Sequence, residues 1–184
     1  AFITSRGQVS KAATVRAIGL LGRQFVLGQT IGAALGEAQG QRRAAPQLRF
    51  SFDMLGEGAR TDADALRYHA AYTAALQAIA ASTQGDGPAG RDGLSIKLSA
   101  LHPRYEEAQL DRVLAELLPR VRALIDLAAA ADINLTIDAE ESDRLELSLT
   151  VFEALADHVA ATAPQWAGFG LAVQAYQTRA LAVV

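Results

Sequence analysis

The stretch Leu94-Ser95-Ile96-Lys97-Leu98-Ser99 is short, mostly apolar and bounded by turn residues, which is typical of a buried β-strand. Three further runs of this kind occur along the chain: Arg49–Leu55 (RFSFDML), Ile133–Ala139 (INLTIDA) and Gly168–Tyr176 (GFGLAVQAY). Long segments with helical spacing separate the four runs. Strands that alternate with helices in this way predict βα units and a parallel sheet.

Each separating segment carries its own helix signal. Thr61, with Asp64 three residues further on, resembles a capping box and predicts that the first helix starts at Thr61. The second helix is predicted from Glu107 to Ala130, and Pro119 within it predicts either a kink or a restart. Ser142 is the predicted N-cap of the third helix.

Two architectures of such a parallel sheet fit the pattern: a doubly wound open sheet, and part of a closed eight-stranded barrel. A dinucleotide-binding open sheet would place a glycine-rich turn directly after a strand. The candidate turn, Gly56-Glu57-Gly58, lacks the third glycine and opens no clear phosphate-binding helix. We therefore expect an α/β fold of the (βα)8-barrel class, with its first four βα units in residues 48–184.

The segment before the strands has a different composition. Residues 1–40 are rich in Ala and Gly with helix-like apolar spacing, which predicts two or three helices, and residues 41–47 (QRRAAPQ) read as a polar linker. We expect residues 1–47 to form a helical segment ahead of the barrel. The chain opens with Ala1 and stops in the apolar run Leu181–Val184, so we expect both ends to be cuts within a longer protein.

The composition excludes several classes of protein. Of the 184 residues, 51% are hydrophobic and 20% are charged, enough for a substantial core, and the net charge of -3 without a basic run argues against a nucleic-acid surface. The chain has no cysteine, which excludes disulfides and thiolate metal sites and suits a reducing cytoplasm. No apolar run reaches the roughly 18 residues that span a bilayer, and no signal-peptide pattern is present.

Polar side chains gather at the carboxyl ends of all four expected strands. They are Asp53 and Glu57 after the first strand, Lys97 and Ser99 at the second, Asp138, Glu140 and Glu141 at the third, and Gln174, Tyr176 and Gln177 at the fourth. Active sites form at this edge in parallel sheets because the βα loops converge there. A single charge at a strand end is more often a helix cap or part of an ion pair, but four successive strands that use the same edge favour a site.

Lys97 is the sharpest candidate, because a charge in an apolar run needs a partner or a polar cavity. It fits an ion pair with Asp138 or Glu140, a cation for a substrate carboxylate, or a Schiff-base lysine with a lowered pKa. Asp138 fits either a residue that orients a basic neighbour or an active-site group that positions a cofactor. The three histidines, His69, His102 and His158, do not have the spacing of metal ligands, and we expect no metal site.

Four motifs resemble consecutive strand motifs of the proline dehydrogenase family, in the family's order and spacing. They are Phe52–Glu57 (FDMLGE), Ser95–Tyr105 (SIKLSALHPRY), Ile137–Arg144 (IDAEESDR) and Val173–Gln177 (VQAYQ). Residues 24–31 (QFVLGQTI) resemble the helical stretch before the barrel in the bifunctional bacterial members, the proline utilisation A enzymes.

The resemblance implies a distorted (βα)8 barrel that binds FAD without a covalent bond. Such an enzyme oxidises L-proline to Δ1-pyrroline-5-carboxylate and passes the electrons to membrane quinone. By position, Lys97 would meet the substrate carboxylate, Asp138 would be the active-site aspartate, and Ala139 and Gln174 would contact the flavin. Glu57 and Tyr176 are weaker candidates near the site. The parent chain would be cytoplasmic, peripheral to the inner membrane, and joined to a pyrroline-5-carboxylate dehydrogenase domain.

The family also brings an arginine in its next strand and an arginine pair in its last helix, neither of which is in this chain. We therefore expect residues 1–184 alone to be inactive. Two other readings stay open at this stage: an aldolase-type barrel with Lys97 as the Schiff-base residue, and a non-catalytic structural fragment.

Overall fold

The computed structural model describes residues 22, 26–54, 56–82 and 84–184, which fall into two compact units, Ala1–Leu48 and Arg49–Val184. In the first unit, helix α2 (Ile31–Ala44) begins after Thr30, whose Oγ1 accepts a hydrogen bond from the Ala33 N–H at 3.2 Å. The predicted linker over 41–47 is therefore wrong in its first four residues, because α2 continues through them to Ala44. Before Ile31, residues 26–30, which include Val26 of the predicted helical spacing, are not helical, and residues 1–21 and 23–25 lie outside the described residues.

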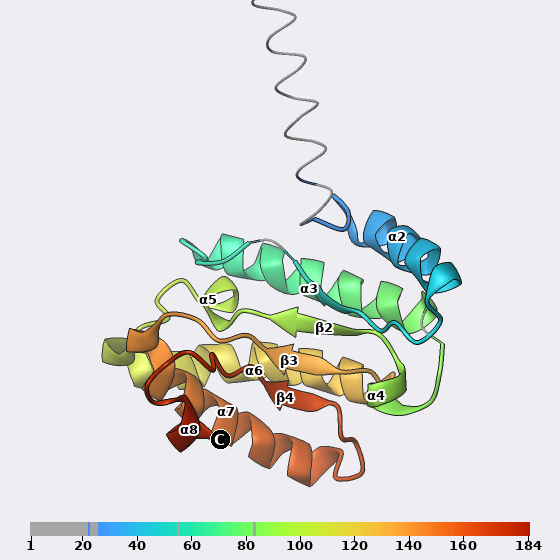
Figure 1. The fold of residues 1–184 in the computed structure, drawn as a ribbon. Coiled ribbons are helices and arrows are strands. Elements are labelled where there is room, and N and C mark those ends of the chain that lie inside the picture. The colour runs from blue at the N-terminus through green and yellow to red at the C-terminus, as the bar shows by residue number, and fades with distance from the viewer. Residues whose placement is uncertain (1–21, 23–25, 55, 83) are drawn as a thin grey trace, which may run out of the picture. The chain divides into compact units, whose positions relative to one another are not determined.

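The second unit contains four short parallel strands in the order of the sequence (Figure 1). They are β1 (Ser51–Asp53), β2 (Gly93–Ile96), β3 (Leu135–Ile137) and β4 (Phe169–Leu171). All four predicted strands are present, each shorter than its apolar run. Because consecutive strands are neighbours throughout, this part of the sheet has no reversal of strand order, and the doubly wound alternative does not apply.

Three long helices connect the strands and pack against one another along the sheet (Figure 1). They are α3 (Asp62–Ser82), α6 (Leu110–Ala130) and α7 (Leu145–Thr162), and the shorter pieces are α4 (Gly87–Gly90), α5 (Leu98–Leu101), η1 (Glu107–Gln109), η2 (Ser142–Arg144) and α8 (Ala180–Val183). The capping box is confirmed: the Asp64 N–H donates to Thr61 Oγ1 at 3.1 Å, and the Thr61 N–H donates to Asp64 Oδ2 at 3.1 Å.

Two details of the predicted helices are corrected. Helix α6 runs through Pro119 as one helix, so the predicted restart does not occur. Ser142 is not the N-cap of α7, because it opens the 3-10 turn η2 and Arg144 takes the cap position instead.

The register of the strands separates a buried face from a polar one. Leu94, Ile96, Leu135 and Ile137 are fully buried, as expected for side chains that face the helices. Asp53, Ser95 and Thr136 pair in one row, and alternation along each strand places them on the opposite face. The carboxyl ends of β1, β2 and β3 thus present polar side chains on one side of the sheet.

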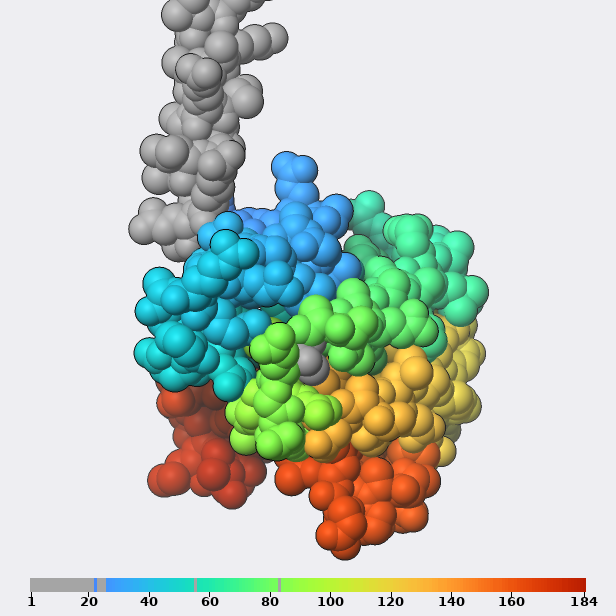
Figure 2. Space-filling view, turned by 90° about the vertical axis from the view of Figure 1, so that its right-hand side faces the viewer, coloured from blue at the N-terminus to red at the C-terminus, as the bar shows by residue number. Residues whose placement is uncertain are grey.

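At the amino-terminal end of the sheet, the side chain of Arg91 joins the loops that lead into two strands. Figure 2 shows the segment around α4, in green, beside the end of α6, in orange. Arg91 Nη1 donates to the Ala131 carbonyl at 2.7 Å, and its Nε donates to the Gly85 carbonyl at 2.8 Å. These bonds connect the loop before β2 with the loop before β3.

Candidate active site

A charged trio lies where β1, β2 and β3 end. Lys97 Nζ donates hydrogen bonds to Asp53 Oδ1 at 2.7 Å and to Asp138 Oδ2 at 2.9 Å. The side chains of Lys97 and Asp138 are 16% and 21% exposed, whereas that of Asp53 is 47% exposed. The structure thus brings together the two principal predicted residues, and it adds Asp53 as a partner where Glu140 was the other expected one.

The electrostatics of Lys97 favour its charged form. Burial by itself lowers the pKa of Lys97, but the hydrogen bonds and charges of Asp53 and Asp138 outweigh burial and raise the pKa above its ordinary value. A Schiff-base lysine needs the opposite shift, because its neutral amine is the nucleophile. The trio therefore supports a permanent cation at this position.

The backbone of Lys97 is fixed as firmly as its side chain. Its N–H donates to the hydroxyl of Tyr72, at 3.2 Å, and Tyr72 is buried in α3. Burial raises the pKa of Tyr72 to about 12, so this hydroxyl stays protonated at neutral pH. Lys97 thus has a fixed position directly after β2, where it is the N-cap residue of α5.

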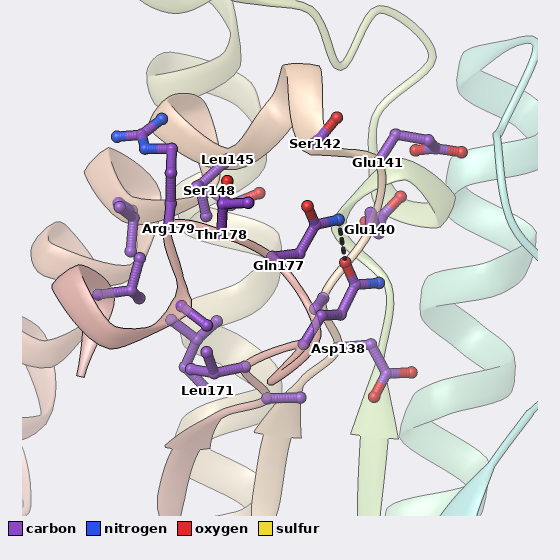
Figure 3. Close-up of a pocket in the computed structure, with 17 residues that line it drawn as sticks. Asp138, Glu140, Glu141, Ser142, Leu145, Ser148, Leu171, Gln177, Thr178 and Arg179 are labelled. Carbon is purple, nitrogen blue, oxygen red and sulfur yellow. Dashed lines mark hydrogen bonds between the residues drawn. The ribbon is translucent and has the colours of Figure 1, made fainter.

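A pocket of about 380 Å³ lies beside the trio, between the ends of β3 and β4 and the short helix α8 (Figure 3). Asp138, Ala139 and Gln174 are among the residues that line it. Gln177 Nε2 donates to Gln174 Oε1 at 3.2 Å, a bond drawn as the dashed line from Gln177 in Figure 3. The pocket combines aliphatic walls with amide and hydroxyl groups and with the charged side chains of Asp138, Glu140, Glu141 and Arg179. Apolar walls with a few polar groups are the usual make-up of a cofactor or ligand site.

A second, more open hollow of about 320 Å³ adjoins the first. Ala139, Gln174 and Gln177 line both, while Glu57 and Tyr176 line this one. Glu57 is exposed, and Tyr176 is 80% exposed. Both weaker candidates therefore lie at the rim of the site, and the predicted flavin contacts Ala139 and Gln174 lie where the two hollows meet.

Comparison with known proteins decides the family. Residues 36–184 match the sequence family described as "Proline dehydrogenase". The chain belongs to the proline dehydrogenase family. It is 48% identical over 168 residues to the bifunctional protein PutA of Escherichia coli (strain K12), and 47% identical over 163 residues to that of Rhizobium meliloti. These matches cover 91% and 89% of this chain but 12% and 13% of the relatives, so the chain spans a small part of their length.

Solved structures agree with this assignment. A point mutant of Bradyrhizobium japonicum proline utilization A (PutA) superposes with a TM-score of 0.78 at 48% identity, over 96% of this chain and 17% of that one. A PutA structure "with proline bound in remote sites" gives 0.78 at 50% identity, over 96% and 18%. PutA from Bdellovibrio bacteriovorus, "inactivated by N-propargylglycine", shares the fold with a TM-score of 0.82 at 20% identity, over 95% and 19%. The predicted fold class is confirmed: these four units belong to a proline dehydrogenase barrel.

The three histidines lie outside the charged trio and do not line either hollow. His102 is buried, its Nε2 lies 3.2 Å from Glu116 Oε2, and its Nδ1 accepts the Arg104 N–H at 3.2 Å. His69 contacts the Arg120 carbonyl, and His158 pairs with Asp126. Across the described residues, no three His, Asp or Glu side chains are grouped as metal ligands would be.

Besides the pairing of Lys97 with Asp53, sequence reasoning missed a contact of Glu140. Glu140 Oε1 accepts the backbone N–H of Ser99 at 3.0 Å, and Glu140 Oε2 lies 3.1 Å from Arg144 Nη1. The spacing of four residues between Glu140 and Arg144 signals an ion pair, but the contact with Ser99 depends on tertiary structure.

Within the described part of the chain, no helix has the length and apolar character needed to cross a membrane.

Proposed function

We propose that the full-length protein oxidises L-proline to Δ1-pyrroline-5-carboxylate with FAD and passes the electrons to membrane quinone, as the first step of proline catabolism to glutamate. The observation that carries this proposal is the Lys97 ammonium, held by Asp53 and Asp138 beside the pocket of a proline dehydrogenase barrel. Membership of the family supports the reaction class.

Lys97 is proposed to bind the carboxylate of proline. An ammonium has three N–H donors, and Asp53 and Asp138 accept two of them, which leaves one for a substrate oxygen. The trio has a formal charge of -1, so Lys97 alone does not make the site positive. The arginine pair expected from the last helix of the family would supply the remaining positive charge.

Asp138 is proposed to keep Lys97 charged and aimed at the substrate. Its carboxylate accepts the Lys97 hydrogen bond, and its backbone N–H donates to the Ile96 carbonyl at 2.9 Å, which fixes it against β2. A group held on both sides needs little reorganisation during the reaction.

The residues present fit a flavin. Ala139 offers a small side chain at the junction of the two hollows, and the paired amides of Gln174 and Gln177 offer donors and acceptors for the edge of a polar ring. FAD, when bound, supplies the two-electron acceptor for the oxidation. The protein's own part is to hold the ring through Ala139 and Gln174 and to orient proline through Lys97.

The setting of the reaction follows from the proposal. Quinone as the electron acceptor would place the protein in the cytoplasm with a peripheral contact to the inner membrane. Relatives named bifunctional protein PutA support a pyrroline-5-carboxylate dehydrogenase domain in the same chain, which would receive the product.

Substitution of Lys97 in the full-length protein tests this function. Lys97→Ala should raise the KM for proline by roughly tenfold or more, because a charge-assisted hydrogen bond to the carboxylate is lost. The affinity for carboxylate-bearing inhibitors should fall by a similar factor for the same reason. Flavin content should stay near that of the wild type. Arg67→Ala is the matched control, since Arg67 is an exposed cation that pairs with Asp64. If the inhibitor affinity is unchanged and flavin is lost, Lys97 does not bind the substrate, and its ion pairs have a structural role instead.

A further inference from the structure

The turn that carries Lys97 is held by a residue from the neighbouring strand. Helix α5 begins after Lys97, and a lysine side chain has no oxygen that could accept the N–H groups of the first turn. The N–H of Ser99, within that turn, donates instead to Oε1 of Glu140 at 3.0 Å. Glu140 thus supplies the cap that Lys97 lacks, which leaves the Lys97 ammonium to the site.

Glu140 is itself held in one position. Its side chain is 5% exposed, and its second oxygen accepts from Arg144 Nη1 at 3.1 Å. Arg144 also pairs with Glu141 at 2.9 Å, and its guanidinium lies 5.9 Å from the centre of the Tyr105 ring. A buried carboxylate with both oxygens partnered has little freedom to move.

The same turn anchors the loop after β1. Ser99 Oγ accepts the Gly58 N–H at 3.2 Å, and the Ser99 carbonyl accepts the Ala59 N–H at 2.8 Å. Glu57, at the rim of the site, directly precedes these two residues. A shift of Ser99 would therefore move both the β1 loop and the backbone that aims Lys97.

We propose that Glu140 is a positioning residue that fixes the Lys97 ammonium against the substrate carboxylate by capping α5 from the end of β3. The proposal rests on the proposed function of Lys97. It assigns Glu140 no contact with substrate: Glu140 acts through Ser99 and the turn Leu98–Leu101.

A double-mutant cycle in the full-length protein tests this role. Glu140→Ala should raise the KM for proline by about tenfold with a smaller change in kcat, because a hydrogen bond to a charged group is lost. Glu140→Gln keeps an oxygen for the Ser99 N–H and should restore the KM to within about threefold of the wild type. Glu106→Ala is the control, since Glu106 is an exposed acid whose carboxylate pairs with Arg104.

The decisive measurement is the same substitution without Lys97. In a Lys97→Met background, Glu140→Ala should change the KM by less than about twofold, because the group that it positions is gone. If Glu140 had a merely structural role, the factors by which Glu140→Ala and Lys97→Met each raise the KM would multiply in the double variant. If Glu140→Ala does not accumulate as folded protein, Glu140→Asp replaces it, since its shorter side chain keeps a charge near Arg144 but withdraws from Ser99.

The outcomes separate the two proposals. If Lys97→Met leaves the KM for proline unchanged, the carboxylate role of Lys97 and the positioning role of Glu140 both fail. If Lys97→Met raises the KM and Glu140→Ala does not, only the positioning role is overturned. The same conclusion follows if both substitutions raise the KM and their factors multiply in the double variant.

Discussion

Lys97 and Asp138 lie level with each other on adjacent parallel strands, and the Lys97 ammonium donates a 2.9 Å hydrogen bond to the Asp138 carboxylate. The pairing of Ile96 with Ile137 sets this level, because each charged residue directly follows its partner of that pair. The register of β2 and β3 therefore determines the geometry of the site.

Asp138→Ala is expected to lower turnover by roughly tenfold or more and to change the absorbance spectrum of the bound flavin, because Lys97 loses a charge-assisted partner. The barrel should remain folded, since the Asp138 side chain lies at the end of a strand and is part-exposed. Steady-state kinetics and flavin spectra of the full-length variant measure both effects.

The control for Asp138 is Asp126→Ala, which removes an exposed acid paired with His158 and should leave turnover within about twofold of the wild type. Aggregation of Asp138→Ala, with Asp126→Ala well folded, would place Asp138 in a structural network and contradict its proposed role.

Much of this arrangement could be predicted from the sequence. Short apolar runs spaced by helical segments predict β1 to β4, and a polar residue after each run predicts the edge where the side chains meet. Once the register is known, alternation along the strands also places the side chains of Asp53, Ser95 and Lys97 on the same face of the sheet. The register is a long-range property, so the pairing of Lys97 with Asp53 was not predicted.

Other features depended on tertiary contacts that no local pattern carries. Leu98–Leu101 continues an apolar run, and such a run does not distinguish the end of a strand from one buried helical turn. The bond from Ser99 to Glu140 joins residues 41 apart in the chain. Pro119 was expected to kink its helix or to restart it, and the restart does not occur, because the packing of the α6 stripe, including Leu117 and Val121, stabilises one continuous helix.

Lys97 should resist Schiff-base trapping. Its pKa is raised above the ordinary 10.5, so its ammonium and the stabilisation from Asp53 and Asp138 are fully present below that pH and are lost only as the pH rises through the higher folded value. Borohydride with a carbonyl substrate at about pH 7 to 9 should give no adduct at Lys97 by peptide mass spectrometry. An adduct at this position, absent from Lys97→Met, would favour the aldolase-type reading.

His102 should make the local stability of α5 depend on pH. Burial lowers the pKa of His102, and Arg112 and Arg120 lower it further, whereas Glu116 opposes the shift. Stability is then present above the ordinary value of 6.5 and is lost as the pH falls through the lower folded value. Hydrogen exchange of the Leu98–Leu101 amides, corrected for intrinsic rates, should show less protection at about pH 5.5 than at about pH 7.5. His102→Gln should flatten this difference, and an unchanged difference would assign it to other groups.

A polypeptide made of residues 1–184 is expected to be helical by far-UV circular dichroism, to bind FAD weakly or not at all, and to show no proline:quinone activity. A (βα)8 barrel needs eight strands, and the described residues provide four, so only half of the rim around the flavin and proline is present. Two parallel edges, β1 and β4, would also drive self-association. Gel filtration, flavin retention and proline-dependent dye reduction measure these properties. Flavin-linked turnover by a homogeneous sample would contradict the argument, and a dimeric mass would then indicate that two copies complete one rim.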